Sequence, residues 1–123
     1  MQKVLIAEDE KDIRDLVGFT LKLAGFDAVF ASNGSEAITQ ALAELPDIIL
    51  MDLHMPVMDG DEAARQIAEE PATHGIPVIY LTARDQDDQI CGQIGKGVDF
   101  ITKPFAIDTI TRKINEVLAR NGK

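Results

Sequence analysis

The sequence predicts an α/β protein of the (βα)5 type, in which helices cover both faces of a doubly wound, five-stranded parallel sheet. Five short apolar segments alternate along the chain with segments of helical periodicity, and three of the five are almost continuously apolar. Strands that alternate with helices form parallel sheets with right-handed crossovers, and continuously apolar strands are typical of sheets covered on both faces. The 123 residues are expected to form one domain.

Five strands are expected at the apolar segments. They are Lys3–Ala7, Phe26–Ala31, Asp47–Asp52, Pro77–Thr82 and Val98–Thr102. Polar residues, proline or glycine bound the first, third and fourth segments, as expected of buried strands. The second segment is more mixed in polarity and is predicted to lie nearer an edge of the sheet.

The first two helices are indicated by apolar residues at helical spacing and by residues that begin or end a helix. One face of the first helix carries Ile13, Leu16, Val17, Thr20, Leu21 and Ala24. Gly25 is expected to end this helix. The second helix is expected to have Ser35 as its N-cap and to end before Pro46.

Three further helices follow in the same way. Their apolar residues are Ala63, Ala64 and Ile67 in the third, Ile90 and Ile94 in the fourth, and Ile107, Ile110, Ile114, Val117 and Leu118 in the last. The fourth pattern is weak, because Gly92 and Gly95 lower its helix propensity.

Composition excludes several classes of protein. The net charge of −9 argues against non-specific binding to nucleic acid or to an anionic membrane, because both need surfaces rich in lysine and arginine. Cys91 is the single cysteine, so no internal disulfide forms and a reducing cytoplasm is expected. No apolar run approaches the roughly 20 residues that cross a bilayer, and no signal peptide is visible.

Polar residues gather where the predicted strands end, which is where sheets of this type bind ligands. These residues are Glu8, Asp9, Asp52, Thr82, Ala83 and Lys103. Three crowded carboxylates repel one another, so at least one pKa should rise unless a cation lies among them. Carboxylate oxygens suit Mg²⁺. A carboxylate nucleophile, a metal ion, a lysine and a hydroxyl together indicate phosphoryl transfer.

Four motifs at these strand ends resemble the receiver domain of two-component response regulators. They are LIAEDE (5–10), IILMDLHMPVMDG (48–60), LTA (81–83) and FITKPF (100–105). The resemblance covers nearly the whole chain, in order. It implies the flavodoxin-like receiver fold with strand order 2-1-3-4-5, and a single receiver domain over residues 1–123 without a separate output domain.

The resemblance also implies a role for each residue at the site. Asp52 would accept a phosphoryl group, and Asp9 and Asp52 would bind Mg²⁺ or Mn²⁺ together with the backbone carbonyl of His54. Glu8 would act through a water molecule of the ion. The other contacts to the phosphoryl group would come from Lys103, from the Thr82 hydroxyl and from the Ala83 backbone N–H.

Three further features follow from the same resemblance. Phe100 occupies the aromatic switch position, where many family members have tyrosine, and would move inward as Thr82 shifts. The Lys103–Pro104 peptide bond is expected to be cis. The segment Gly92–Phe100 departs from the family pattern, and the chain is about one residue short between Thr82 and Phe100, so the fourth helix is the least transferable part of the fold.

The function implied is that of a signalling switch rather than an enzyme. The switch would catalyse only its own phosphorylation and dephosphorylation. The phosphodonor would be a sensor histidine kinase or a histidine phosphotransfer protein. The output would be the binding of an unknown protein effector, without direct contact to nucleic acid or a membrane. The chain would be a monomer or a weak phosphorylation-dependent dimer. A terminal regulator, a relay intermediate and a receiver cut from a longer protein all remain open.

Other classes of protein are weighed against this interpretation. A phosphohydrolase with an aspartate nucleophile typically has a second aspartate two residues later, where this chain has His54. A flavodoxin-type flavin module needs a phosphate loop rich in serine, threonine or glycine after the first strand, whereas EDEKD would repel phosphate. An inert pseudo-receiver is a third alternative, and the intact acid pair, acceptor aspartate and lysine argue against it. Taken alone, Asp9 could simply cap a helix and Thr82 could be an ordinary β-branched strand residue.

Overall fold

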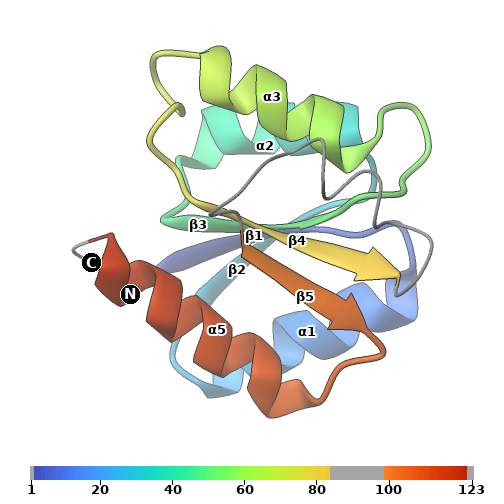
Figure 1. The fold of residues 1–123 in the computed structure, drawn as a ribbon, viewed down its shortest axis with the longest axis vertical. Helices are drawn as coiled ribbons and strands as arrows, with labels where there is room; N and C mark the ends of the chain where they lie inside the picture. The colour runs from blue at the N-terminus through green and yellow to red at the C-terminus, as the bar shows by residue number, and fades with distance from the viewer. Residues whose placement is uncertain (1, 84–98, 122–123) are drawn as a thin grey trace.

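A computed structural model describes residues 2–83 and 99–121 of the chain. Five parallel strands form one sheet in the order β2-β1-β3-β4-β5 (Figure 1). The strands are β1 (Lys3–Ala7), β2 (Asp27–Ala31), β3 (Ile48–Asp52), β4 (Val78–Ala83) and β5 (Asp99–Lys103). The predicted fold class and strand order are therefore confirmed, and the strand bounds differ from those predicted by at most one residue at either end.

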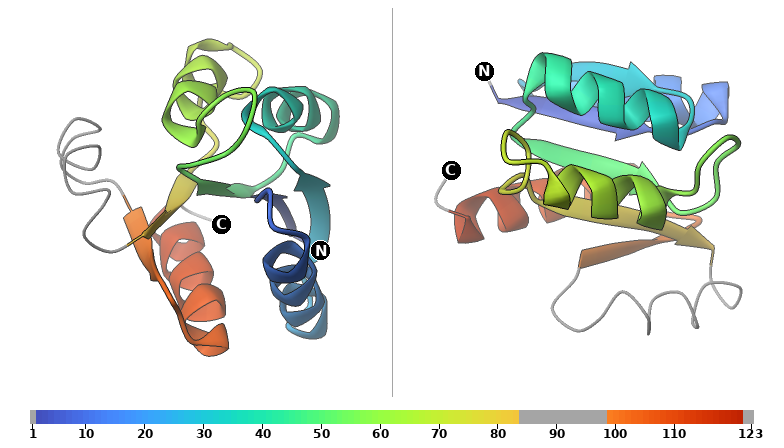
Figure 2. Two further views of the ribbon diagram at one scale, coloured as in Figure 1. Left: turned by 90° about the vertical axis from the view of Figure 1, so that its right-hand side faces the viewer. Right: turned by 90° about the horizontal axis from the view of Figure 1, so that it is seen from above.

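Helices cover both faces of this sheet. They are α1 (Lys11–Leu23), α2 (Gly34–Glu44), α3 (Gly60–Glu69) and α5 (Ile107–Arg120). Figure 2 shows α1 and α5 on one face and α2 and α3 on the other. The predicted fourth helix and Cys91 lie outside the described residues. Within the described ranges, no helix is long and apolar enough to span a membrane.

Two apolar clusters lie between the sheet and its helices, because successive side chains of a strand point to opposite faces. Along β1, Val4 and Ile6 belong to the cluster under α1 and α5, whereas Leu5 and Ala7 belong to the cluster under α2 and α3. Strands β1 and β3 are buried on both faces. Strand β2 is less buried and lies at an edge of the sheet, as its mixed polarity predicts.

The predicted cap of the second helix is wrong by two residues. Asn33, not Ser35, is the N-cap of α2, and its side-chain oxygen accepts a hydrogen bond of 2.8 Å from the Glu36 N–H. Helix α2 therefore begins at Gly34, whose N–H donates to the Met58 carbonyl at 3.1 Å. A side chain here would collide with that carbonyl, since an added Cβ would lie 2.2 Å from its oxygen.

The predicted buried face of the first helix is only partly correct. The buried residues of α1 are Val17, Gly18 and Leu21, whereas Leu16 is 46% exposed. The cause lies at Gly18, where the Phe30 ring of β2 comes so close that an added Cβ would lie 2.5 Å from it. Because this contact turns the Gly18 side of the helix to the sheet, Leu16 lies at the margin of the buried stripe.

The described chain begins and ends at the same edge of the sheet. Strand β1 begins at Lys3, at the amino edge of a sheet whose strands all run in parallel. The last turn of α5 returns to this edge, where Arg120 Nη2 lies 2.6 Å from Asp99 Oδ2 at the start of β5 (Figure 1). The carboxyl ends of the strands form the opposite edge.

Val57, in the loop between β3 and α3, has a left-handed backbone conformation that is unusual for a β-branched residue. Its φ is 69° and its side chain is exposed. Asparagine tolerates this conformation better, so Val57→Asn is expected to raise the free energy of unfolding by about 1 kcal/mol. Urea denaturation measures the change, with Val57→Ile as a control that keeps the strain. A less stable Val57→Asn protein would contradict this explanation.

Candidate functional site

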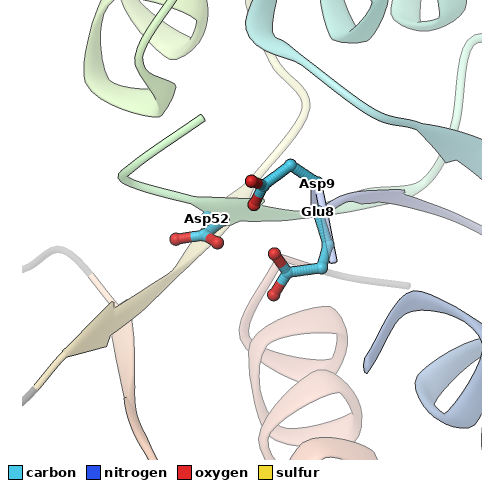
Figure 3. Close-up of side chains that lie close together, drawn as sticks. All are labelled: Glu8, Asp9 and Asp52. Carbon is cyan, nitrogen blue, oxygen red and sulfur yellow. The ribbon is translucent and has the colours of Figure 1, made fainter. Parts of the chain in front are cut away.

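The carboxyl edge of the sheet brings three carboxylates together. Glu8 directly follows β1, Asp9 follows Glu8, and Asp52 ends β3. One carboxylate oxygen from each residue lies within 4.8 Å of the others. Figure 3 shows the three side chains converging on a common space. The predicted acidic site is therefore present as a geometric cluster.

Strand register explains why these side chains meet. Ala7 of β1 pairs with Met51 of β3, so the residues that follow them, Glu8 and Asp52, are neighbours. Asp52 pairs with Leu81, which places Thr82 one step beyond it on the adjacent strand. Ala83 pairs with Lys103 in turn, so both lie at the same edge. The predicted convergence follows directly from parallel pairing.

Lys103 links two of the carboxylates. Its Nζ lies 2.7 Å from Glu8 Oε1 and 3.0 Å from Asp52 Oδ2. Although burial opposes the charged form, hydrogen bonds to both carboxylates raise the pKa of Lys103 above its ordinary value. The Lys103–Pro104 peptide bond at the end of β5 is cis, which agrees with the prediction. Lys103 therefore supplies a fixed positive charge within the acidic site.

Glu8 is fully buried, unlike an ordinary acidic residue of a loop. Burial, and then its interaction with Asp52, raise the pKa of Glu8 to about 8, and Lys103 offsets only part of this shift. Glu8 Oε2 also accepts a hydrogen bond of 3.3 Å from the Glu10 N–H, and Arg14 donates to the Glu8 backbone carbonyl at 2.8 Å. The site thus contains more negative groups than one lysine can neutralise, as the sequence predicts.

In the metal-free protein, the free energy of unfolding is expected to fall as the pH rises from about 5 to about 8. Unfolded Glu8 loses its proton near the ordinary pKa of 4.5, whereas the folded carboxyl keeps its proton up to about 8. The folded state therefore binds more protons across this interval. The resulting stability is fully present below pH 4.5 and is lost as the pH rises through about 8.

Thermal unfolding in EDTA at a series of pH values measures this dependence. Glu8→Gln, which cannot ionise, is the matched variant and is expected to flatten the curve. Added Mg²⁺ should flatten it as well, because a cation favours the ionised carboxyl. A wild-type protein that gains stability between pH 5 and pH 8 would contradict the assignment to Glu8.

The loop after β3 packs tightly against Asp52. Asp52 Oδ1 accepts a hydrogen bond of 3.2 Å from the His54 backbone N–H. Gly60, the first residue of α3, donates its N–H to the Leu53 carbonyl at 2.9 Å. A Cβ at Gly60 would lie 2.0 Å from the Asp52 backbone oxygen, so only glycine fits here. The position of Asp52 therefore depends on close approach of α3.

The remaining predicted residues lie at the same edge with different exposure. Thr82, near the end of β4, is buried, whereas the Asp9 and His54 side chains are exposed. Ala83 ends β4 beside Lys103. Phe100 lies near the start of β5, away from the carboxyl edge, and pairs with Tyr80 of β4. All the predicted residues therefore lie at this edge except Phe100, which lies three residues before Lys103 on β5.

Tyr80 was not among the residues predicted for the site. Its ring stacks on Phe100, with centroids 5.6 Å apart and an interplanar angle of 30°. One signal was available in the sequence, because Tyr80 is the single tyrosine and stands in an otherwise aliphatic segment two residues before Thr82. Pairing of β4 with β5 was needed to bring it to Phe100.

Comparisons with known proteins agree with the fold and the motifs. A family model, the response regulator receiver domain, matches residues 4–115. The alkaline phosphatase synthesis transcriptional regulatory protein PhoP of Bacillus subtilis is 32% identical over 121 residues, which are 98% of this chain and 50% of that protein. The chemotaxis response regulator CheY4 of Vibrio cholerae has a TM-score of 0.86 and 32% identity, with 95% of this chain and 98% of that chain covered.

A third similar protein has a metal ion at its site. The receiver domain of the sensor histidine kinase PA1611 from Pseudomonas aeruginosa, whose structure has a magnesium ion coordinated in the active site cleft, has a TM-score of 0.87 and 29% identity. The match covers 96% of this chain and 98% of that domain.

This chain belongs to the family of response regulator receiver domains, which act in phosphorylation-based two-component signalling. Members of this family are switches that interact with sensor histidine kinases and typically bind Mg²⁺. The chain spans about half the length of the curated relatives it matches.

Proposed function

We propose that Asp52 accepts a phosphoryl group from a phosphohistidine donor in the presence of Mg²⁺ or Mn²⁺, and that the new charge switches a protein-binding surface. The observation that carries this proposal is the cluster of Glu8, Asp9 and Asp52 with Lys103 among its carboxylates. In the transfer, a bond forms between an Asp52 carboxylate oxygen and phosphorus while the phosphorus–nitrogen bond of the donor breaks.

The donor set fits a hard divalent cation. Three carboxylates offer oxygen ligands at one edge of the sheet, and Mg²⁺ is usually held by one or two carboxylates together with water and a phosphate. Asp9 and Asp52 would bind the ion with the His54 carbonyl, and Glu8 would act through water. When bound, the ion would neutralise charge on the phosphoryl oxygens.

The other residues of the edge would stabilise the phosphorylated state. Lys103, whose Nζ pairs with Asp52 in the unphosphorylated protein, would pair with a phosphoryl oxygen instead. Thr82 would donate its hydroxyl and Ala83 its backbone N–H to the other oxygens. Phe100 would respond to the movement of Thr82. The positions of Thr82, Ala83 and Lys103 at the ends of β4 and β5 support the roles given to these three residues.

The proposal extends to the setting in which the switch works. Residues 1–123 would form one receiver domain in the cytoplasm, phosphorylated by a sensor histidine kinase or a histidine phosphotransfer protein. The effector would be a protein, and the chain would be a monomer or a weak phosphorylation-dependent dimer. Transfer assays with candidate donors and acceptors distinguish a terminal regulator from a relay intermediate.

The test is to incubate the protein with a small acyl phosphate donor, with Mg²⁺ or with EDTA, and to measure the intact mass. We expect a gain of one phosphoryl group that requires Mg²⁺, is lost in base and maps to the peptide containing Asp52. A gain on another residue, or one that persists in EDTA, would refute the proposal. Rapid, repeated turnover of a phosphate ester would instead favour the phosphohydrolase class.

A further inference from the structure

Tyr80 and Phe100 form an aromatic contact two residues before the proposed switch residue Thr82 on β4. The two residues are register partners on β4 and β5, and their rings stack with centroids 5.6 Å apart. Both contribute to the apolar cluster under α2 and α3, where Tyr80 is buried and Phe100 is partly buried. The contact therefore links the central part of the sheet to its β5 edge.

Thr82 and Tyr80 lie on the same face of β4, beside Phe100 of β5. They are two residues apart on β4, so their side chains point to the same face of the sheet. Register pairs Tyr80 with Phe100 and Thr82 with Thr102, which makes Tyr80 the direct neighbour of Phe100 and Thr82 its diagonal neighbour. A Phe100 ring that follows Thr82 has to change its contact with Tyr80.

Tyr80 is the more firmly held partner of the pair. Tyr80 is only 7% exposed, whereas Phe100 is partly buried and packs against the cluster. Burial, together with the negative charge of Asp61 on α3, raises the pKa of the Tyr80 phenol above its ordinary value. Phe100 has no polar side-chain atom, so packing alone fixes the position of its ring. The Tyr80 ring is thus a fixed surface against which Phe100 rests.

We propose that Tyr80 is a positioning residue whose ring holds Phe100 in its resting position and thereby opposes the phosphorylated state of the switch. This inference rests on the proposed function, because it assumes that phosphorylation at Asp52 moves Phe100. By linkage, a contact that stabilises the resting state weakens binding of any ligand that favours the other state. Removal of the Tyr80 ring should therefore strengthen binding of a phosphoryl mimic.

The first test uses the fluorescence of the protein itself. Since the chain has one tyrosine and no tryptophan, its emission comes from Tyr80 alone. Beryllofluoride with Mg²⁺, a non-covalent phosphoryl mimic, is expected to change this emission in the wild-type protein, whereas Mg²⁺ alone should change it far less. In Phe100→Leu, which has no ring to move, the mimic should bind with little change in emission. An equal change in both proteins would overturn the inference.

The second test measures affinity for beryllofluoride with Mg²⁺ by isothermal titration calorimetry. Tyr80→Leu should bind the mimic about two- to tenfold more tightly than the wild type, which corresponds to the loss of one aromatic stack. Tyr80→Phe keeps the ring and should bind like the wild type. If Tyr80→Leu does not fold, as judged by circular dichroism, Tyr80→Met takes its place.

The outcomes separate this inference from the proposed function. If the wild type neither binds the mimic nor gains a phosphoryl group by mass, the proposed function fails and the inference fails with it. If the wild type binds the mimic but Tyr80→Leu has unchanged or weaker affinity, the inference alone is overturned. Tighter binding in Tyr80→Leu, with wild-type affinity in Tyr80→Phe, supports a positioning role that a purely structural residue would not show.

Discussion

Replacement of Asp52 with asparagine is expected to abolish Mg²⁺-dependent phosphoryl uptake while stabilising the metal-free protein at pH 8. Uptake should fall by about a hundredfold or more, because the amide cannot act as the nucleophile. Stability should rise by about 1 kcal/mol, since the charge that repels Glu8 is removed and Lys103 is left to pair with Glu8 alone.

Intact mass after incubation with an acyl phosphate and urea denaturation at pH 8 measure the two effects. Asp59→Asn is the matched control, because Asp59 lies near the site but is exposed and makes no side-chain cap hydrogen bond to α3. It should leave both uptake and stability unchanged. A phosphoryl adduct that survives Asp52→Asn would mean that another residue is the nucleophile. An unstable Asp52→Asn protein would contradict the repulsion inferred between Glu8 and Asp52.

Replacement of Gly60 with alanine is expected to lower the free energy of unfolding by about 3 kcal/mol. An added Cβ would lie 2.0 Å from the Asp52 backbone oxygen and 2.9 Å from Met51 Cγ. The nearest atom belongs to the backbone of a buried strand and cannot turn aside, so α3 has to shift. Such a shift would also displace Asp52, and slower phosphorylation should accompany the loss of stability.

Gly75→Ala is the control for this substitution. No heavy atom lies within 4 Å of a Cβ added at Gly75, so this variant should have nearly wild-type stability. Urea denaturation of the two variants, with phosphorylation rates measured by mass, separates steric collision from a general effect of replacing glycine. A Gly60→Ala protein as stable as Gly75→Ala would show that α3 adapts without cost.

The fold could be predicted because its signals are local and numerous. Each buried strand is a continuous apolar segment, and the boundaries of β1 match the prediction at both ends. Details that depend on contacts between distant segments could not be predicted. Asn33 caps α2 in place of Ser35 because Gly34 has to approach Met58. Leu16 is exposed because Phe30 of β2 packs against Gly18 of α1, and this contact cannot be read from the periodicity of the helix alone.

The site could be predicted in its composition but not in its electrostatics. Parallel pairing guarantees that residues after successive strands share one edge, so the convergence of Glu8, Asp9 and Asp52 follows from sequence order. Complete burial of Glu8 does not follow, because adjacent acidic residues are usually solvated. The double contact of Lys103 with Glu8 and Asp52 likewise depends on side-chain geometry that residue types do not specify.

The described chain begins and ends at the sheet edge opposite the acidic cluster, and this geometry has a practical consequence. Strand β1 begins and α5 ends at the amino edge, with α5 joined to β5 there by Arg120 and Asp99. A biotin, a resin or a fused fluorescent protein attached beyond either end would face away from Asp52. Immobilised protein should therefore bind metal ions and phosphoryl mimics as the free protein does, which allows surface-based titration of every variant described above.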